Sequence, residues 1–206
     1  KIITPYGLDE LFFKRKKIKR SVLKPIAIFT SNPLRKLDWL LNLWENRIFP
    51  NVPSAKLYIF SGYSTYGKFG EKHSLKINKI LLKAKKLKNK GVILNKPIKR
   101  SMLFSKIKKS RLFLYGSSID ETFCMSAAES QILCTPGVVM NSGCLSERII
   151  NKKTGYVCDN EEEFIKRTIE LLVDNNQWIK MHTYLLKNNH HYSWKEIAQK
   201  WKKVLE

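Results

Sequence analysis

Long apolar runs are missing from this sequence. No uninterrupted apolar stretch reaches the ~18 residues that a membrane-spanning helix needs. The basic N-terminal part also lacks the apolar region of a signal peptide. Both absences argue against a membrane-embedded or secreted protein, so we expect a cytoplasmic location. With 206 residues, 43% of them hydrophobic, the chain is long enough to bury one sizeable core.

Closely spaced cysteines are also absent. The chain has four cysteines, at positions 124, 134, 144 and 158, and no two of them form a C-x-x-C pair. That spacing is typical of zinc sites and of thiol redox motifs. The sequence therefore predicts no metal site and no redox centre, and we expect four reduced, mostly buried thiols.

Acidic residues are scarce relative to basic ones. The 17 acidic side chains face 39 Lys and Arg, which gives a net charge of +22, with lysine concentrated in residues 14–24 and 76–109. Such a surplus creates a positive surface potential. The simplest interpretation is a set of solvated helix faces. Peripheral association with an anionic membrane is a further possibility, and nucleic acid is the least favoured partner.

Apolar strands alternate with amphipathic helices along most of the chain. Continuous apolar runs predict strands over residues 26–30, 57–60, 92–94, 112–115 and 137–140. Apolar residues at helical spacing predict helices over 36–48, 77–87, 101–110, 123–133, 160–173, 177–187 and 194–205. After Met140 we expect only helices. This alternation is typical of an α/β, Rossmann-like parallel sheet with helices on both faces, here followed by C-terminal helices.

The two ends of the chain differ from this core. Residues 1–24 contain turn-forming and strongly basic segments, which predict a linker, so we expect the compact domain to span residues 25–192. Residues 193–206 open with the capping box of Ser193 and Glu196 and carry Trp194 and Trp201. Two tryptophans on a terminal helix need a surface to pack against.

Two glutamates flank the helix start that follows the strand 112–115. Ligands of doubly wound sheets bind at the carboxyl ends of the strands. A helix start offers free N–H groups and a positive dipole end, which suit a diphosphate. Glu121 precedes this helix, and Glu129 lies roughly two turns into it, where it can accept hydrogen bonds from a ribose diol. A structural interpretation stays open, in which Glu121 is favoured by the dipole and Glu129 is solvated.

Glu121 and Glu129 enclose seven residues, as in the E-x7-E signature of retaining glycosyltransferases with the GT-B fold. The surrounding sequence resembles glycosyltransferase family 4. The segments that carry the resemblance are residues 121–124, 129–130, 135–139, 142–143, 147 and 154–155. The resemblance implies one half of a GT-B fold, the donor-binding C-terminal domain. Residues 4–9 then look like the linker from the N-terminal domain, and 193–205 like the helix that crosses back onto it.

The resemblance also implies the roles of individual residues. Glu129 would hold the ribose and Glu121 would orient the sugar, while Arg35 and Lys36 would stabilise the leaving diphosphate together with the helix start at Phe123, Cys124 and Met125. Ser31 stands where the family often has a phosphate-binding arginine, and Thr122 and Cys124 replace two glycines. The remaining donor-binding residues expected by resemblance are Gly62, Pro97, Ile98, Ser142 and Gly143.

The resulting prediction is a hexose transfer from a nucleotide sugar with retention of configuration. The acceptor would be a glycan or lipid-linked glycan held by an N-terminal domain absent from this chain. No cofactor or divalent metal is implied. The alternative is a non-catalytic basic α/β module that binds RNA or an anionic membrane. Steep salt dependence without nucleotide preference would favour that alternative.

Overall fold

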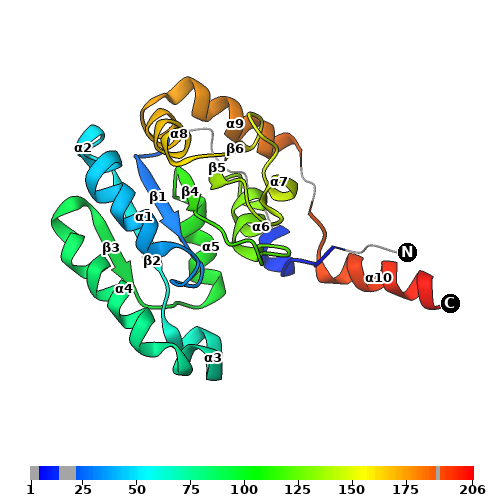
Figure 1. Cartoon of the computed structure of the whole chain (residues 1–206). Helices are drawn as coiled ribbons and strands as arrows, with labels where there is room; N and C mark the ends of the chain where they lie inside the picture. The colour runs from blue at the N-terminus through cyan, green and yellow to red at the C-terminus, as the bar shows by residue number, and fades with distance from the viewer. Residues whose placement is uncertain (1–4, 14–21, 189–190) are drawn as a thin grey trace.

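A six-stranded parallel sheet forms the centre of the computed structural model, which describes residues 5–13, 22–188 and 191–206 (Figure 1). The strands lie in the order β3-β2-β1-β4-β5-β6. Their bounds are β1 Ile26–Phe29, β2 Lys56–Phe60, β3 Val92–Asn95, β4 Leu112–Tyr115, β5 Gly137–Met140 and β6 Gly155–Cys158. This order is that of the doubly wound dinucleotide-binding fold, so the predicted fold class is confirmed.

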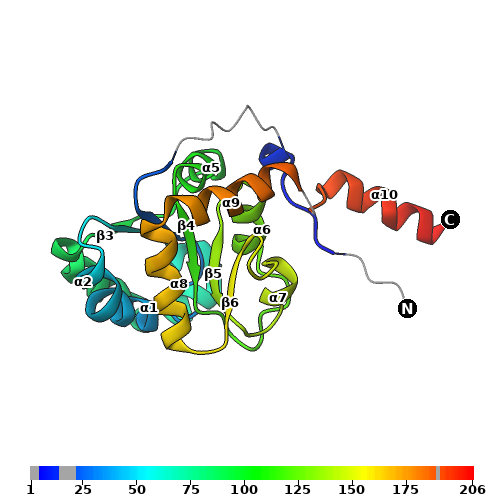
Figure 2. The ribbon, with the colours of Figure 1, turned by 90° about the horizontal axis from the view of Figure 1, so that it is seen from above.

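Helices surround the sheet, as the two views show (Figures 1 and 2). They are α1 Leu37–Leu43, α2 Phe49–Asn51, α3 Gly67–Lys72, α4 Ser74–Lys86, α5 Arg100–Lys108, α6 Met125–Ile132, α7 Leu145–Arg148, α8 Glu161–Val173, α9 Asn175–Lys187 and α10 Trp194–Leu205. Shorter turns are η1 Glu10–Phe13, η2 Trp44–Ile48, η3 Tyr63–Tyr66 and η4 Leu87–Lys90, of which η2 is a π-helical continuation of α1. Because helices cover the sheet, the central strand β4 is buried along its whole length.

The sixth strand corrects the expectation that the chain is wholly helical after Met140. β6 pairs with β5 in parallel register, with Gly155 opposite Gly137 and Cys158 opposite Met140. All four of its residues are buried. A run this short is ambiguous in sequence because only its place beside β5 makes it a strand.

The N-terminal segment also differs from the expected linker. Leu8 and Phe12 are fully buried, and the ring of Phe12 packs 5.7 Å from that of Phe104. Leu8 forms a parallel bridge with Ser193. Residues 5–13 are therefore part of the packed domain, because their apolar side chains offset the ordering of the segment. Most of the predicted basic run in the linker, residues 14–21, lies outside the described residues.

The last helix begins as the sequence predicts. Ser193 caps α10, its hydroxyl accepts from the Glu196 backbone N–H, and the Glu196 side chain accepts from the Ser193 N–H. From there α10 extends away from the sheet (Figures 1 and 2). Trp194 and Trp201 stay 46% and 45% exposed. Within the described ranges, no helix has both the length and the apolar character needed to cross a bilayer.

Candidate functional site

A cleft of about 510 Å³ opens at the carboxyl ends of the strands. It lies beside the neighbouring strands β1 and β4, where the strand order reverses. The chain leaves β1 toward β2 on one side of the sheet and leaves β4 toward β5 on the other, which leaves a crevice between the two connections. The residues that line it come from the loops after β1, β2, β3 and β4 and from the first turns of α5 and α6. They are Thr30, Ser31, Asn32, Arg35, Phe60, Ser61, Thr65, Tyr66, Pro97, Ile98, Arg100, Leu103, Glu121, Cys124, Met125, Ser126 and Glu129.

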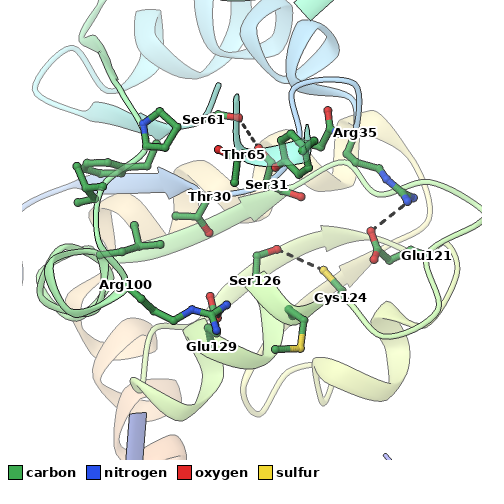
Figure 3. Close-up of a pocket in the computed structure, with 17 residues that line it drawn as sticks. Thr30, Ser31, Arg35, Ser61, Thr65, Arg100, Glu121, Cys124, Ser126 and Glu129 are labelled. Atoms are coloured by element: carbon green, nitrogen blue, oxygen red, sulfur yellow. Dashed lines mark hydrogen bonds and ion pairs between the residues drawn. The ribbon is translucent and has the colours of Figure 1, made fainter. Parts of the chain in front are cut away.

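At one end of the cleft, a hydrogen bond from Tyr115 and an ion pair with Arg35 fix the Glu121 carboxylate, and Figure 3 shows the ion pair. The Tyr115 hydroxyl donates to Glu121 Oε2 over 2.5 Å, and Arg35 Nη1 lies 3.6 Å from the same oxygen. Ser31 Oγ donates to the Tyr115 hydroxyl at 3.4 Å. Burial raises the pKa of Tyr115, so this residue remains a neutral donor. The network holds the carboxylate beside a cation in a partly enclosed space.

The start of α6 forms the floor of the cleft. Cys124 has a left-handed backbone, with φ 55°, and the helix begins at Met125 rather than at Phe123 as expected. The first backbone N–H groups of a helix are free of intrahelical partners and favour an anion. Burial raises the pKa of the Cys124 thiol to about 12, so the thiol is protonated and leaves this end of the cleft without a second negative charge.

At the opposite end, Glu129 pairs with Arg100 (Figure 3). Arg100 Nη2 lies 2.8 Å from Glu129 Oε1, and the Glu129 side chain is only 6% exposed. Burial raises the pKa of Glu129 to about 7, while Arg100 acts in the opposite direction and Asp9 raises it further. This buried acid therefore changes charge in the physiological pH range.

Eight of the predicted site residues line this cleft, and they come from four separate loops or helix starts. They are Ser31, Arg35, Pro97, Ile98, Glu121, Cys124, Met125 and Glu129. The other five predicted residues, Lys36, Phe123, Gly62, Ser142 and Gly143, are not among the lining residues. The two glutamates and the expected arginine are thus brought into one space.

Two of the five residues point elsewhere. The ammonium of Lys36 lies 5.8 Å from the Trp39 ring centroid, so the phosphate role expected for Lys36 has no support from its position. Phe123 packs its ring 5.2 Å from that of Tyr6 and 4.4 Å from the Arg148 guanidinium. These contacts account for the burial of the Phe123 ring.

Gly62 lies just outside the main cleft. A Cβ at this position would meet the Pro97 ring at 3.1 Å. Gly62 and Pro97 instead share a neighbouring cleft of about 850 Å³, which also contacts α4. Pro97 therefore lies between the two spaces.

The turn of Ser142 and Gly143 packs against the backbone of Glu121. Gly143 has φ 57°, and a Cβ there would lie 2.6 Å from the Glu121 carbonyl oxygen. Cys144 N–H also donates to that carbonyl at 3.0 Å. The pair consequently shapes the site through the backbone that carries the acid.

Replacing Gly143 with alanine is expected to lower the free energy of unfolding by about 2 kcal/mol, because the methyl group adds left-handed strain and a backbone clash. Urea denaturation measures the change. Ser142→Ala is the control, since it changes the preceding residue of the same turn without adding a Cβ. Equal losses in the two variants would contradict this explanation.

Several residues of the site were not predicted from the sequence, and three of them bear most directly on its chemistry. Arg100 and Tyr66 line the cleft, and Tyr115 holds Glu121 from beneath. Tyr66 lies close in sequence to Tyr58 and Tyr63, and such aromatic residues more often pack than bind a ligand. Tyr115 is the last residue of an apolar strand. Of the three, only Arg100 could have been suspected from the sequence. It follows the loop after β3, and ligands bind at the carboxyl ends of such strands.

Three buried polar atoms in the cleft lack a hydrogen-bond partner: Thr30 Oγ1, Arg35 Nη1 and Glu129 Oε1, the last two having only their ion-pair contacts. Buried polar groups are ordinarily hydrogen-bonded, so these atoms indicate a space shaped for a polar ligand. In the described part of the chain, no three His, Cys, Asp or Glu side chains gather as a metal site would require.

The sequence model of the protein family described as "Glycosyl transferases group 1" matches residues 53–203 of this chain. No curated protein has a significantly similar sequence. Among solved structures, HepE of Anabaena in complex with UDP-glucose is similar with TM-score 0.71 and 12% identity, over 97% of this chain and 55% of HepE.

Two further structures differ in how much of their length is matched. TarM of S. aureus, a mutant in complex with fondaparinux, alpha-GlcNAc-glycerol and UDP, gives TM-score 0.67 and 18% identity over 88% of this chain and 36% of TarM. The C-terminal domain of LpcC from Francisella tularensis gives TM-score 0.57 and 13% identity, over 95% of this chain and 98% of that domain. At these identities the likeness concerns the fold.

Proposed function

Since the chain belongs to the glycosyl transferases group 1 family, we propose that it is the donor-binding part of a retaining glycosyltransferase of the family 4 type. The observation that carries the proposal is the cleft between β1 and β4, which gathers Arg35, Glu121, the start of α6 and Glu129. A nucleoside-diphosphate sugar has one group for each of these partners. The family membership does not favour a non-catalytic basic module.

In this proposal each part of the donor would have its own partner in the cleft. The α6 start and Arg35 would take the diphosphate, since both favour an anion. Glu129 would accept hydrogen bonds from the ribose diol. Glu121 would orient the transferred sugar and stabilise positive charge at its anomeric carbon. Pro97 and Ile98 would pack against the base.

The proposed transfer retains configuration. The bond between the anomeric carbon and the phosphate oxygen breaks, and the acceptor hydroxyl forms a new bond on the same face. The hydroxyl proton passes to the departing phosphate oxygen. Arg35 and the α6 N–H groups stabilise the charge that develops on the diphosphate, a role that needs neither cofactor nor divalent metal in this proposal.

The acceptor belongs to the part of the enzyme outside this chain. This chain spans 36% of TarM and 55% of HepE. We propose that an N-terminal domain holds a glycan or lipid-linked glycan and that α10 crosses onto it. The exposed Trp194 and Trp201 give α10 a surface for such contact. The basic surface would suit peripheral association with the inner face of a membrane.

Calorimetric titration with UDP, GDP, ADP and UMP tests the proposal. We expect one base to be preferred and the diphosphate to bind more tightly than the monophosphate. Glu129→Ala should weaken binding by at least ~10-fold, because hydrogen bonds to a charged group are lost. Glu71→Ala, which removes an exposed acid of α3, is the control. Absence of binding by every nucleotide, or an unchanged affinity in Glu129→Ala, would overturn the assignment.

A further inference from the structure

Arg100 lies between a carboxylate and an aromatic ring. Its guanidinium lies 2.8 Å from Glu129 Oε1 on one side and 5.9 Å from the Phe12 ring centroid on the other. Phe12 is fully buried and packs on Phe104 of α5. The ring and the carboxylate together hold Arg100 at the wall of the cleft. Figure 3 shows Arg100 beside Glu129.

The position of Arg100 is unfavourable without Glu129. Arg100 is the first residue of α5, and a cation near a helix N-terminus opposes the helix dipole. The carboxylate of Glu129 compensates for this. In return, Arg100 offsets the free-energy cost of a negative charge on the Glu129 side chain, which is only 6% exposed.

The other charged groups around Glu129 do not replace Arg100. Burial, the larger effect, and the charge of Asp9, from the segment before η1, both raise the pKa of Glu129. Asp9 therefore opposes the ionisation of Glu129. Arg35 pairs with Glu121 in the same cleft. On α7, which packs against α6, Arg148 pairs with its neighbour Glu147 at 2.9 Å.

We propose that Arg100 is a positioning residue of the donor site, which keeps Glu129 ionised and directed into the cleft so that the ribose diol can donate to it. This inference rests on the proposed function. It gives Arg100 an effect on binding that depends on pH. A direct contact between Arg100 and the nucleotide would instead weaken binding by the same factor at every pH.

The affinity for UDP in Arg100→Gln and wild type, compared from about pH 6 to about pH 9, separates these cases. We expect the variant to bind about 10-fold more weakly at the acidic end and less than about 2-fold more weakly at the alkaline end, since Glu129 ionises there without help. Ionisation of UDP itself is common to both proteins. Arg100→Lys should restore most of the affinity, and Lys106→Gln, an exposed charge on the same helix, should change little.

A constant ratio across the pH range would overturn the proposal. The carboxyl carbon of Glu129, followed by NMR in the free protein, gives an independent measurement. Its titration midpoint should rise by about one pH unit in Arg100→Gln and stay unchanged in Lys106→Gln; an unmoved midpoint in Arg100→Gln would also overturn it. If no nucleotide binds to the wild type, the proposed function fails, while the carboxyl titration still decides whether Arg100 keeps Glu129 ionised.

Discussion

Replacing Arg111 with methionine is expected to lower the free energy of unfolding by about 3–5 kcal/mol. Arg111 is only 2% exposed. Its guanidinium donates four hydrogen bonds that tie the start of β4 to the segment before β1 and to the junction of α8 and α9. The acceptors are the carbonyl oxygens of Leu171, Leu23 and Asp174 and the Oδ1 of Asn175, at 2.6 to 3.0 Å. Methionine fills similar volume but leaves these oxygens unpaired.

Urea denaturation measures this loss, and the matched control is Arg47→Met. Arg47 makes two hydrogen bonds of 2.8 Å to Glu162, but both side chains are solvent-exposed. Water replaces a partner there, so the control should unfold almost as wild type does. If both variants lost the same small amount of stability, burial of the Arg111 hydrogen bonds would not matter as we expect.

Replacing Gly155 with alanine should destabilise the domain by about 3 kcal/mol or more. β5 and β6 approach so closely at this point that a Cβ on Gly155 would lie 2.0 Å from the Gly137 carbonyl oxygen and 2.7 Å from its nitrogen. Both contacts involve backbone atoms, so no side-chain rotation relieves them. The two strands must separate locally and lose hydrogen bonds at the edge of the sheet.

Thermal and urea unfolding of Gly155→Ala give the measurement, with Lys153→Ala, an exposed change in the same turn, as the control. A variant that matches the stability of Lys153→Ala would show that the strands tolerate the methyl group. The same close approach explains why a glycine stands in the Thr154-Gly155 turn, which is part of the family resemblance. Close pairing of two strands requires the glycine there.

The fold could be predicted because the main strands are apolar runs. A strand covered on both faces excludes polar residues, so β1, β2, β4 and β5 were recognisable without knowledge of their neighbours. β6 and the segment around Leu8 and Phe12 depend on tertiary partners. Their few apolar residues acquire meaning only beside β5 and α5.

The candidate site divides in the same way. Glu121 and Glu129 were found because the topology places a helix start there and because their spacing resembles a family signature. Arg100 contacts Glu129 and Tyr115 contacts Glu121, and the local sequence around either residue does not indicate which carboxylate it will face. The distance in sequence between partners, rather than residue type, limited the prediction.

The strand order bears on how the cleft forms during folding. β1 pairs with β4 through Ala27 and Leu112, which lie much farther apart in sequence than the partners of any other strand pair. Closing the longest loop costs the most chain entropy, and long-range pairing slows folding. Strands β1–β3 and β4–β6 can each assemble from nearer neighbours, but the cleft exists only once β1 and β4 are joined. Binding of a nucleotide would therefore report the final docking step of folding, and mutations along the β1–β4 seam should slow the appearance of binding more than the appearance of helical structure.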